Sequence, residues 1–139
     1  KHNSRPFIFS ASIPPANAAA AIAALEIIKS EPERIQRLRD ISYYMRQGFR
    51  KLGLPIYEAN SEITPIVPVM TYTNEPTLVV TKMLREEGVY VNPVLSPAVK
   101  PGLCRIRTSY TATHTQEQLD YTLEAFKRVF EKLNITAGK

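Results

Sequence analysis

The chain has 139 residues, of which 44% are hydrophobic, which suits the core of one globular domain and leaves little room for two. No apolar run approaches the roughly 20 residues that span a bilayer, so we expect no integral membrane segment. The single cysteine, Cys104, excludes an intramolecular disulfide and a cysteine cluster for a metal, and a reducing cytoplasm is the simplest compartment.

The net charge of +5 has two interpretations. It fits a solvated surface rich in lysine and arginine, and it also fits attraction to an anionic partner such as a phosphate-bearing substrate. The basic residues are spread along the expected helices, and no aromatic–basic motif of an RNA-binding sheet occurs. We therefore expect no nucleic-acid partner.

The first half of the chain predicts two helices. An apolar extended segment, Phe7–Phe9, precedes an alanine-rich helix over 16–29, whose small side chains indicate close packing against another body. Ser30 and Glu33 form a candidate capping box for a second helix that ends at Gly53. Its apolar residues recur at steps of three and four, and its arginines are expected to be solvated: Arg34, Arg37, Arg39, Arg46 and Arg50.

The second half predicts short strands and two more helices. Strands are expected over 55–59, 63–72, 89–91 and 103–110, and the prolines in the second of these favour an edge position. A helix opens at Asn74 and stops at Gly88, and a capping box of Thr115 and Gln118 starts the last helix. The order predicts an α+β fold in which helices cover a small, mostly antiparallel sheet.

The last predicted strand carries the best candidate for a binding residue. Arg105 and Arg107 lie two residues apart and therefore share a face. The planar fork of arginine suits a carboxylate, so an anionic ligand or an internal salt bridge could satisfy one of them. His114 is interpreted as a loop or capping residue. Ser10 and Ser12, which precede a helix, could act as caps or bind a phosphate.

No Ser-His-Asp set, glycine-rich phosphate loop or metal-ligand spacing is present, and no metal is expected. The residues alone thus predict an α+β domain with a candidate anion-binding arginine.

Three motifs in chain order resemble the α-oxoamine synthases, which are fold-type I enzymes of the aminotransferase class I/II group that depend on pyridoxal phosphate. Residues 7–15, FIFSASIPP, resemble the segment just beyond the cofactor lysine of that family. Residues 87–91, EGVYV, followed by a proline-rich loop, are similar to its "EEG-(I/V)-x-V" strand. Residues 105–109, RIRTS, and 112–115, ATHT, resemble its closing signature.

The resemblance implies a transferase of the EC 2.3.1 type. Such enzymes condense glycine, alanine or serine with an acyl-CoA and lose CO2 and CoA, as in 8-amino-7-oxononanoate synthase or serine palmitoyltransferase. By position, Arg107 corresponds to the arginine that pairs with the amino-acid carboxylate, and Ser10 to a hydroxyl that reaches the cofactor phosphate across a dimer interface. Val94, Leu95 and Pro97 would border the substrate entrance. A cytoplasmic homodimer is expected.

The resemblance also implies that residues 1–139 form a single C-terminal small domain, with residues 1–30 connecting it to a large pyridoxal-phosphate-binding domain. The family's Schiff-base lysine lies upstream of residues 7–10, so this stretch of chain holds no catalytic residue. We expect it to be inactive and not to bind the cofactor alone. Leu95 stands where some serine palmitoyltransferases carry an extra arginine, which weakens that assignment. The alternatives are part of a fold-type I aminotransferase, or a non-catalytic interaction module.

Overall fold

The computed structural model describes Asn3, residues 13–57 and residues 64–135. Within it the chain divides into two compact units, Lys1–Arg34 and Ile35–Lys139, each described by itself. The extended segment expected over Phe7–Phe9 and the candidate residues Ser10 and Ser12 lie outside the described residues. The prediction that residues 1–139 act as one C-terminal domain remains a prediction.

The described part of the first unit includes helix α2 (Pro15–Ser30), which begins with proline at its first position. No side chain of α2 is buried, and Ile22 and Leu25 are 59% and 57% exposed. The expected cap at Ser30 is wrong. Ser30 is the last residue of α2, and its hydroxyl donates back to the carbonyl of Glu26 at 3.0 Å. The hydroxyl thus bonds back within the helix that Ser30 ends, a local alternative to a cap.

The second unit begins within α3 (Glu33–Lys51), whose end agrees with the sequence prediction. Gly53 has a φ of +67°, in the left-handed region that favours glycine, and the amide of Leu54 donates to the carbonyl of Phe49 at 3.0 Å. This arrangement satisfies carbonyls that a helix end would otherwise leave unpaired.

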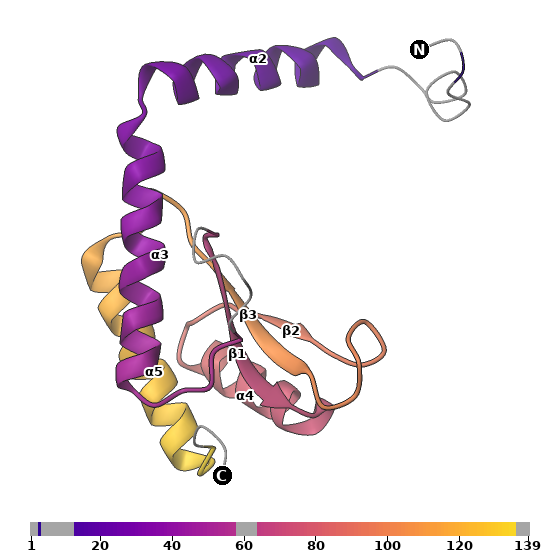
Figure 1. Cartoon of the computed structure of the whole chain (residues 1–139), viewed down its shortest axis with the longest axis vertical. Coiled ribbons are helices and arrows are strands. Elements are labelled where there is room, and N and C mark those ends of the chain that lie inside the picture. Colours follow the sequence, from indigo (N-terminus) through magenta and orange to yellow (C-terminus); the bar gives the residue numbers. More distant parts are fainter. Residues whose placement is uncertain (1–2, 4–12, 58–63, 136–139) are drawn as a thin grey trace. The chain divides into compact units, whose positions relative to one another are not determined.

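A small antiparallel sheet comes next, made of β1 (Ile66–Tyr72), β2 (Asn92–Val94) and β3 (Cys104–Ser109) in the order β1-β3-β2 (Figure 1). Outside β1, Ile56 adds a single antiparallel bridge to Val69. The strand expected over 89–91 is shifted in the structure. Those residues lead into β2, and Val89 and Val91 are buried in the core instead. Pairing with β3, which no local pattern reveals, decides where the strand begins.

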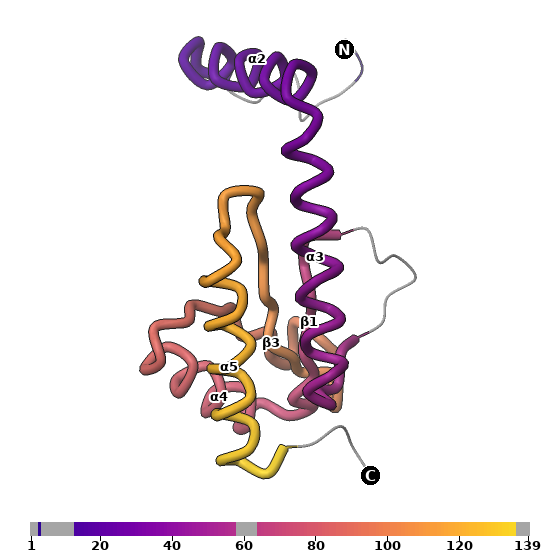
Figure 2. Tube along the Cα trace, turned by 90° about the vertical axis from the view of Figure 1, so that its left-hand side faces the viewer, coloured from indigo at the N-terminus to yellow at the C-terminus, as the bar shows by residue number. Residues whose placement is uncertain are grey.

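Two further helices, α4 (Asn74–Glu86) and α5 (Gln116–Lys132), complete the unit (Figure 2). Helices α3, α4 and α5 share one hydrophobic core with one face of the sheet. The rings of Phe49 and Phe126 lie 4.9 Å apart between centroids, joining α3 to α5. Val67, Val69 and Ile106 are fully buried beneath them. The predicted α+β fold, a small antiparallel sheet covered by helices, is confirmed.

The corner between β1 and α4 is unusual. The register of β1 against β3 shifts between Met70 and Tyr72, and Tyr72 has a φ of +66°. An aromatic residue in this region costs about 1–3 kcal/mol, so the surrounding structure must hold it there. The buried hydroxyls of Thr71 and Thr77 are 2.6 Å apart and hydrogen-bonded across the corner. A bulge of this kind bends a strand end and redirects the chain beyond it.

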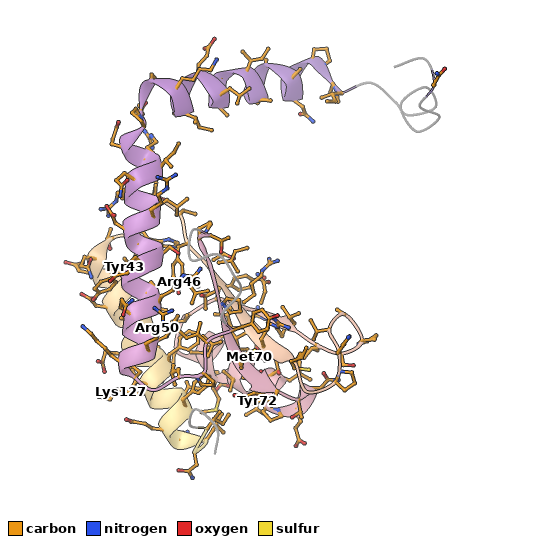
Figure 3. All side chains as sticks on the ribbon, in the orientation of Figure 1. Tyr43, Arg46, Arg50, Met70, Tyr72 and Lys127 are labelled. Atoms are coloured by element: carbon orange, nitrogen blue, oxygen red, sulfur yellow. The ribbon has the colours of Figure 1, made fainter. Side chains whose placement is uncertain are left out.

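Arg46 corrects the expectation that the arginines of α3 are solvated. Only 5% of its surface is exposed, and its Nη2 atom donates to the carbonyls of Thr64 and Ile66 at 3.0 Å each. Figure 3 shows Arg46 on the side of α3 that faces the strands. The side chain thus satisfies the backbone just before and at the start of β1, because an arginine carries enough donors to do so from the helix.

The capping box of α5 provides a test of the fold. Thr115 accepts from the amide of Gln118, and the Gln118 side chain accepts from the amide of Thr115. Thr115→Ala removes one of these bonds and should lower the free energy of unfolding by about 1 kcal/mol. Thr115→Ser keeps the hydroxyl and should retain most of the stability. Equal losses in both variants, measured by urea denaturation, would contradict the capping role.

Candidate functional site

The face of the sheet opposite the core carries Arg107. In β3 the side chains alternate, so that Cys104, Ile106 and Thr108 are buried while Arg107 is exposed. Arg107 lies in the central strand, opposite Pro68 of β1 and Asn92 of β2. Within the described part of the chain its guanidinium has no hydrogen bond and no ion pair. Among the described residues, its donors are therefore left without a protein partner.

Arg105, on the same face, is already engaged. Its Nε donates to the carbonyl of Leu103 at 3.0 Å, and its guanidinium carbon lies 4.2 Å from the centroid of the Tyr57 ring. Tyr57 is held there because its amide donates to the carbonyl of Pro68 at 2.9 Å. A guanidinium stacked on an aromatic ring is fixed in orientation by that contact. The two arginines thus differ, and Arg107 is the one free to bind an anion.

The described residues bring no acidic side chain to Arg107. None of the three strands contains an aspartate or glutamate. The ion pairs seen in the described residues lie elsewhere, as in Arg34–Glu31 and Arg128–Glu87. The sequence left open an anionic ligand and an internal salt bridge. Within the part of the chain that it describes, the structure shows no acidic side chain paired with Arg107.

Ser10, the other expected site residue, lies outside the described residues, so its role stays a prediction. Pattern reasoning did not identify Tyr57, although it helps to distinguish the two arginines. Its role arises from pairing between residues 55–57 and β1, which no sequence motif announces. Asn92, opposite Arg107, could not be placed there until the shift of β2 was known.

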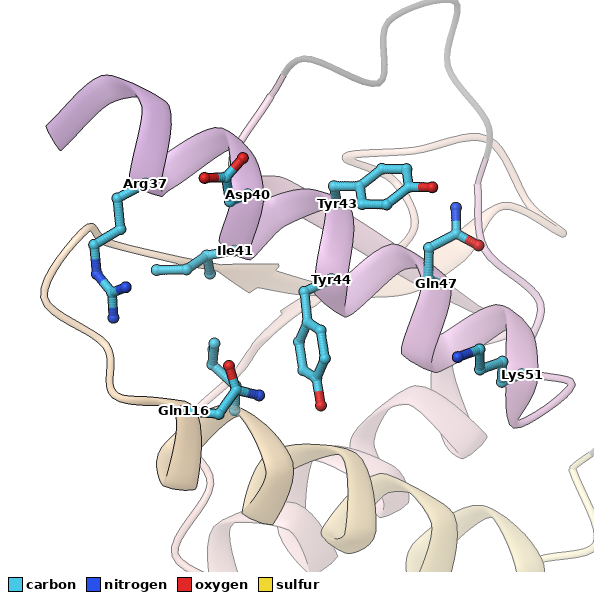
Figure 4. Close-up of a pocket in the computed structure, with 9 residues that line it drawn as sticks. Arg37, Asp40, Ile41, Tyr43, Tyr44, Gln47, Lys51 and Gln116 are labelled. Carbon is cyan, nitrogen blue, oxygen red and sulfur yellow. The ribbon is translucent and has the colours of Figure 1, made fainter. Parts of the chain in front are cut away.

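A groove with a volume of about 570 Å³ lies between α3 and the start of α5 (Figure 4). Several polar side chains that line it already make hydrogen bonds within the protein. Arg37 donates to the carbonyls of Ala112 and His114, both at 2.9 Å. Tyr44 donates to Asp120, and this bond is the main reason why the pKa of Tyr44 is raised. Since Arg37 and Asp40 already have protein partners, they are not free to orient a ligand in this groove, and Arg107 does not line it.

A second hollow of about 620 Å³ lies beside residues 88–91 and the start of α5. His114 borders it, but its Nδ1 accepts from the amide of Thr111 at 2.9 Å, as expected of a residue that closes a loop. Tyr110 also borders this hollow, and its hydroxyl is buried without a hydrogen-bond partner in the described residues. Burial raises the pKa of Tyr110 well above its usual 10. Arg107 does not line this hollow either.

Two features are absent from residues 3, 13–57 and 64–135. Across these residues, no group of three or more histidine, cysteine, aspartate or glutamate side chains is arranged to hold a metal ion. None of their helices is long and apolar enough to cross a membrane.

Comparison with known proteins shows the family of the chain. The model of the family "Aminotransferase class I and II" matches residues 1–126. The chain belongs to this family. It is 41% identical over 135 residues to serine palmitoyltransferase of Bacteroides thetaiotaomicron, covering 97% of this chain and 34% of that protein. It is 38% identical to 8-amino-7-oxononanoate synthase of Thermosipho melanesiensis, with the same coverage.

The fold has close structural counterparts. A solved structure of SPT with a PLP internal aldimine superposes with a TM-score of 0.89 and 27% identity, covering 96% of this chain and 33% of that one. The chain spans about a third of the length of the proteins it matches. The resemblance to α-oxoamine synthases inferred from three motifs is confirmed, since both named relatives belong to that group.

Tyr110 provides a test of the electrostatics. Because its pKa is raised in the folded state, unfolding above about pH 10 releases a proton that the folded chain retains. The free energy of unfolding should therefore fall as the pH rises from about 10 toward the folded pKa. In Tyr110→Phe this component of the fall should disappear, and stability at pH 7.5 should be equal or slightly higher, because a buried unpaired hydroxyl is lost.

The measurement is urea denaturation at pH 7.5 and at about pH 10.5. Tyr90→Phe is the matched control, since Tyr90 is 79% exposed and should leave the pH dependence unchanged. A pH dependence of Tyr110→Phe equal to that of the unaltered chain would show that the phenol ionises as readily in the folded state as in the unfolded one.

Proposed function

We propose that this chain is the substrate-carboxylate-binding part of a pyridoxal-phosphate-dependent acyltransferase, which condenses glycine, alanine or serine with an acyl-CoA and loses CO2. The observation that carries the proposal is Arg107. It is exposed on the central strand, free of internal partners among the described residues and beside an arginine that is already engaged. The similarity to serine palmitoyltransferase and 8-amino-7-oxononanoate synthase supports the reaction class.

Arg107 orients the amino acid in this proposal. Two parallel hydrogen bonds from the guanidinium to the carboxylate fix both the position and the plane of that group. The bond at the α-carbon that breaks is then selected by how the substrate is held, and positioning of this kind contributes much of the rate of an enzyme. Arg105, held on Tyr57, adds positive potential to the face without competing for the same ligand.

Pyridoxal phosphate would supply the electron sink for the reaction when bound. The residue assigned to its phosphate, Ser10, lies outside the described residues, and no described residue is assigned to the cofactor. The proposal for this chain therefore concerns the amino-acid carboxylate.

The same proposal extends to the rest of the protein, its assembly and its location in the cell. It includes a large cofactor-binding domain in the same polypeptide, a homodimer and a cytoplasmic location. The share of the relatives that the chain spans, about a third, supports the first of these. The unpartnered apolar side chains of α2 support a packing partner for residues 1–30.

An aminotransferase is the second candidate, because the matching family model carries that description and such an enzyme also needs an arginine for a substrate carboxylate. The two differ in the second substrate. An aminotransferase requires a 2-oxo acid, whereas the acyltransferase requires an acyl-CoA and releases CoA. The test supplies glycine, alanine or serine together with acetyl-CoA or palmitoyl-CoA and omits any 2-oxo acid. Release of free CoA thiol from the acyl-CoA indicates the acyltransferase.

Arg107→Ala in the complete enzyme should raise the KM for the amino acid at least about thirtyfold, since loss of a buried charge-assisted pair costs about 2–5 kcal/mol. Arg107→Lys keeps the charge without the fork and should recover only part of that loss. Arg105→Ala is the matched control on the same strand and face, with a smaller expected effect. An unchanged amino-acid KM in Arg107→Ala, from steady-state kinetics, would reject the assigned role.

A further inference from the structure

Residues 95–103 form the loop of the hairpin between β2 and β3, and a side chain outside the hairpin holds this loop by hydrogen bonds. The loop has few backbone bonds of its own: the amide of Val99 donates to the carbonyl of Leu95 at 3.2 Å, and that of Leu103 to Lys100 at 3.0 Å. Neither bond joins the loop to another element. A nine-residue loop with only such local bonds needs an external contact to keep one position.

Asn74 supplies that contact at both ends of the loop. Its Oδ1 accepts from the amide of Ser96 at 3.0 Å and from the Sγ of Cys104 at 3.1 Å. Its Nδ2 donates to the carbonyl of Ser96 at 3.4 Å. Ser96 lies near the start of the loop, and Cys104 comes directly after its end. A single side chain thus joins the two ends to each other and to α4.

These bonds are not those of a helix cap. Asn74 is the first residue of α4, the N-cap is Thr73, and no side chain caps the helix there. All the bonds of the Asn74 side chain go to the hairpin. The bulge at Tyr72 and the buried Thr71–Thr77 bond hold the corner from which Asn74 projects. Figure 1 shows the hairpin loop at the end of the sheet where β1 turns into α4.

The loop lies next to the arginine face. Val94, the residue before the loop, is opposite Arg105 in the register. Arg107 lies two residues further along β3. The loop is mostly apolar, with Leu95, Pro97, Ala98, Val99 and Pro101 against one charge, Lys100. An apolar wall beside a cationic group suits a ligand pair in which one member carries a carboxylate and the other an alkyl chain.

We propose that Asn74 is a positioning residue that holds the loop 95–103 as an apolar wall for the acyl chain of the acyl-CoA substrate. This inference rests on the proposed function. It separates the two substrates, because Arg107 binds the amino acid while Asn74 acts through the loop on the acyl chain. Loss of the Asn74 side chain should therefore affect one Michaelis constant and leave the other unchanged.

The first test measures the loop directly, by hydrogen–deuterium exchange on the complete protein. In Asn74→Ala, exchange in peptides that cover residues 95–103 should rise about tenfold, the change expected when a few hydrogen bonds are lost, while α4 stays protected. Asn74→Asp keeps an oxygen that accepts from Ser96 and Cys104 but loses the donor to the Ser96 carbonyl, so loop exchange should rise less than in Asn74→Ala. Gln116→Ala is the matched control, since Gln116 is the first residue of α5 and its side chain bonds to Asp120 and Tyr44, neither of which belongs to the hairpin.

The second test measures kinetics with whichever of acetyl-CoA and palmitoyl-CoA the unaltered enzyme prefers. Asn74→Ala should raise the KM for that acyl-CoA about tenfold and change the amino-acid KM by less than about twofold. Asn74→Asp keeps two of the three bonds and should give an acyl-CoA KM between those of Asn74→Ala and the unaltered enzyme. A residue that merely stabilised α4 would alter protein stability without this selective effect.

Each outcome has one meaning. Unchanged exchange of residues 95–103 in Asn74→Ala overturns the anchoring role, whatever the activity. Faster loop exchange with an unchanged acyl-CoA KM overturns the link to the acyl chain. If the unaltered enzyme releases no CoA thiol from either acyl-CoA, the proposed function fails and the acyl role fails with it, while the exchange experiment still decides whether Asn74 anchors the loop.

Discussion

Alternation along β3 is the constraint on which the rest of this structure depends. One set of its side chains, Ile106 with Cys104 and Thr108, is buried under three helices, so the register of the strand cannot slip without exposing them. Because the period of a strand is two, the same register places Arg105 and Arg107 on the opposite face. The hydrophobic core thus determines where the cationic face lies.

The contrast between the two arginines arises from the segments that flank β3. Residues 55–57 bridge to the outer edge of β1, and this brings the ring of Tyr57 to Arg105. Arg107 lies two residues further along β3, between Pro68 and Asn92, neither of which is charged. Two identical side chains on one face therefore have different freedom, and the difference comes from pairing between segments about 50 residues apart in sequence.

Local signals in the sequence predicted the features that depend on neighbouring residues. The capping box of Thr115 and Gln118, the left-handed glycine after α3 and the alternation of β3 are all confirmed, because each is fixed within a few residues. Predictions that required knowledge of distant partners were less accurate. Helical spacing placed Arg46 on a solvated face, but carbonyls near β1 receive its donors. The start of β2 was misplaced because its pairing with β3 has no local signature.

The same division applies to the candidate site. Arg107 was identified by spacing and motif, both local, whereas Tyr57 and Asn74 matter only through contacts made across the fold. At Ser30 the local sequence was not decisive, because two different hydrogen bonds were open to its hydroxyl. A serine between two helices can cap the second or bond back to the first, and here the carbonyl of Glu26 takes the hydroxyl.

The exposure of Arg107 has an energetic consequence for how such a site must work. In open water an ion pair between a guanidinium and a carboxylate contributes only about 0–1 kcal/mol, because solvent screens both charges. The same pair becomes much stronger once another surface excludes water from it, since the effective dielectric constant then falls. A face with a free arginine and no nearby acid on its strands is therefore suited to a site completed by a second body. On this reasoning the affinity for a carboxylate that we propose for Arg107 would depend as much on what covers the face as on the arginine itself.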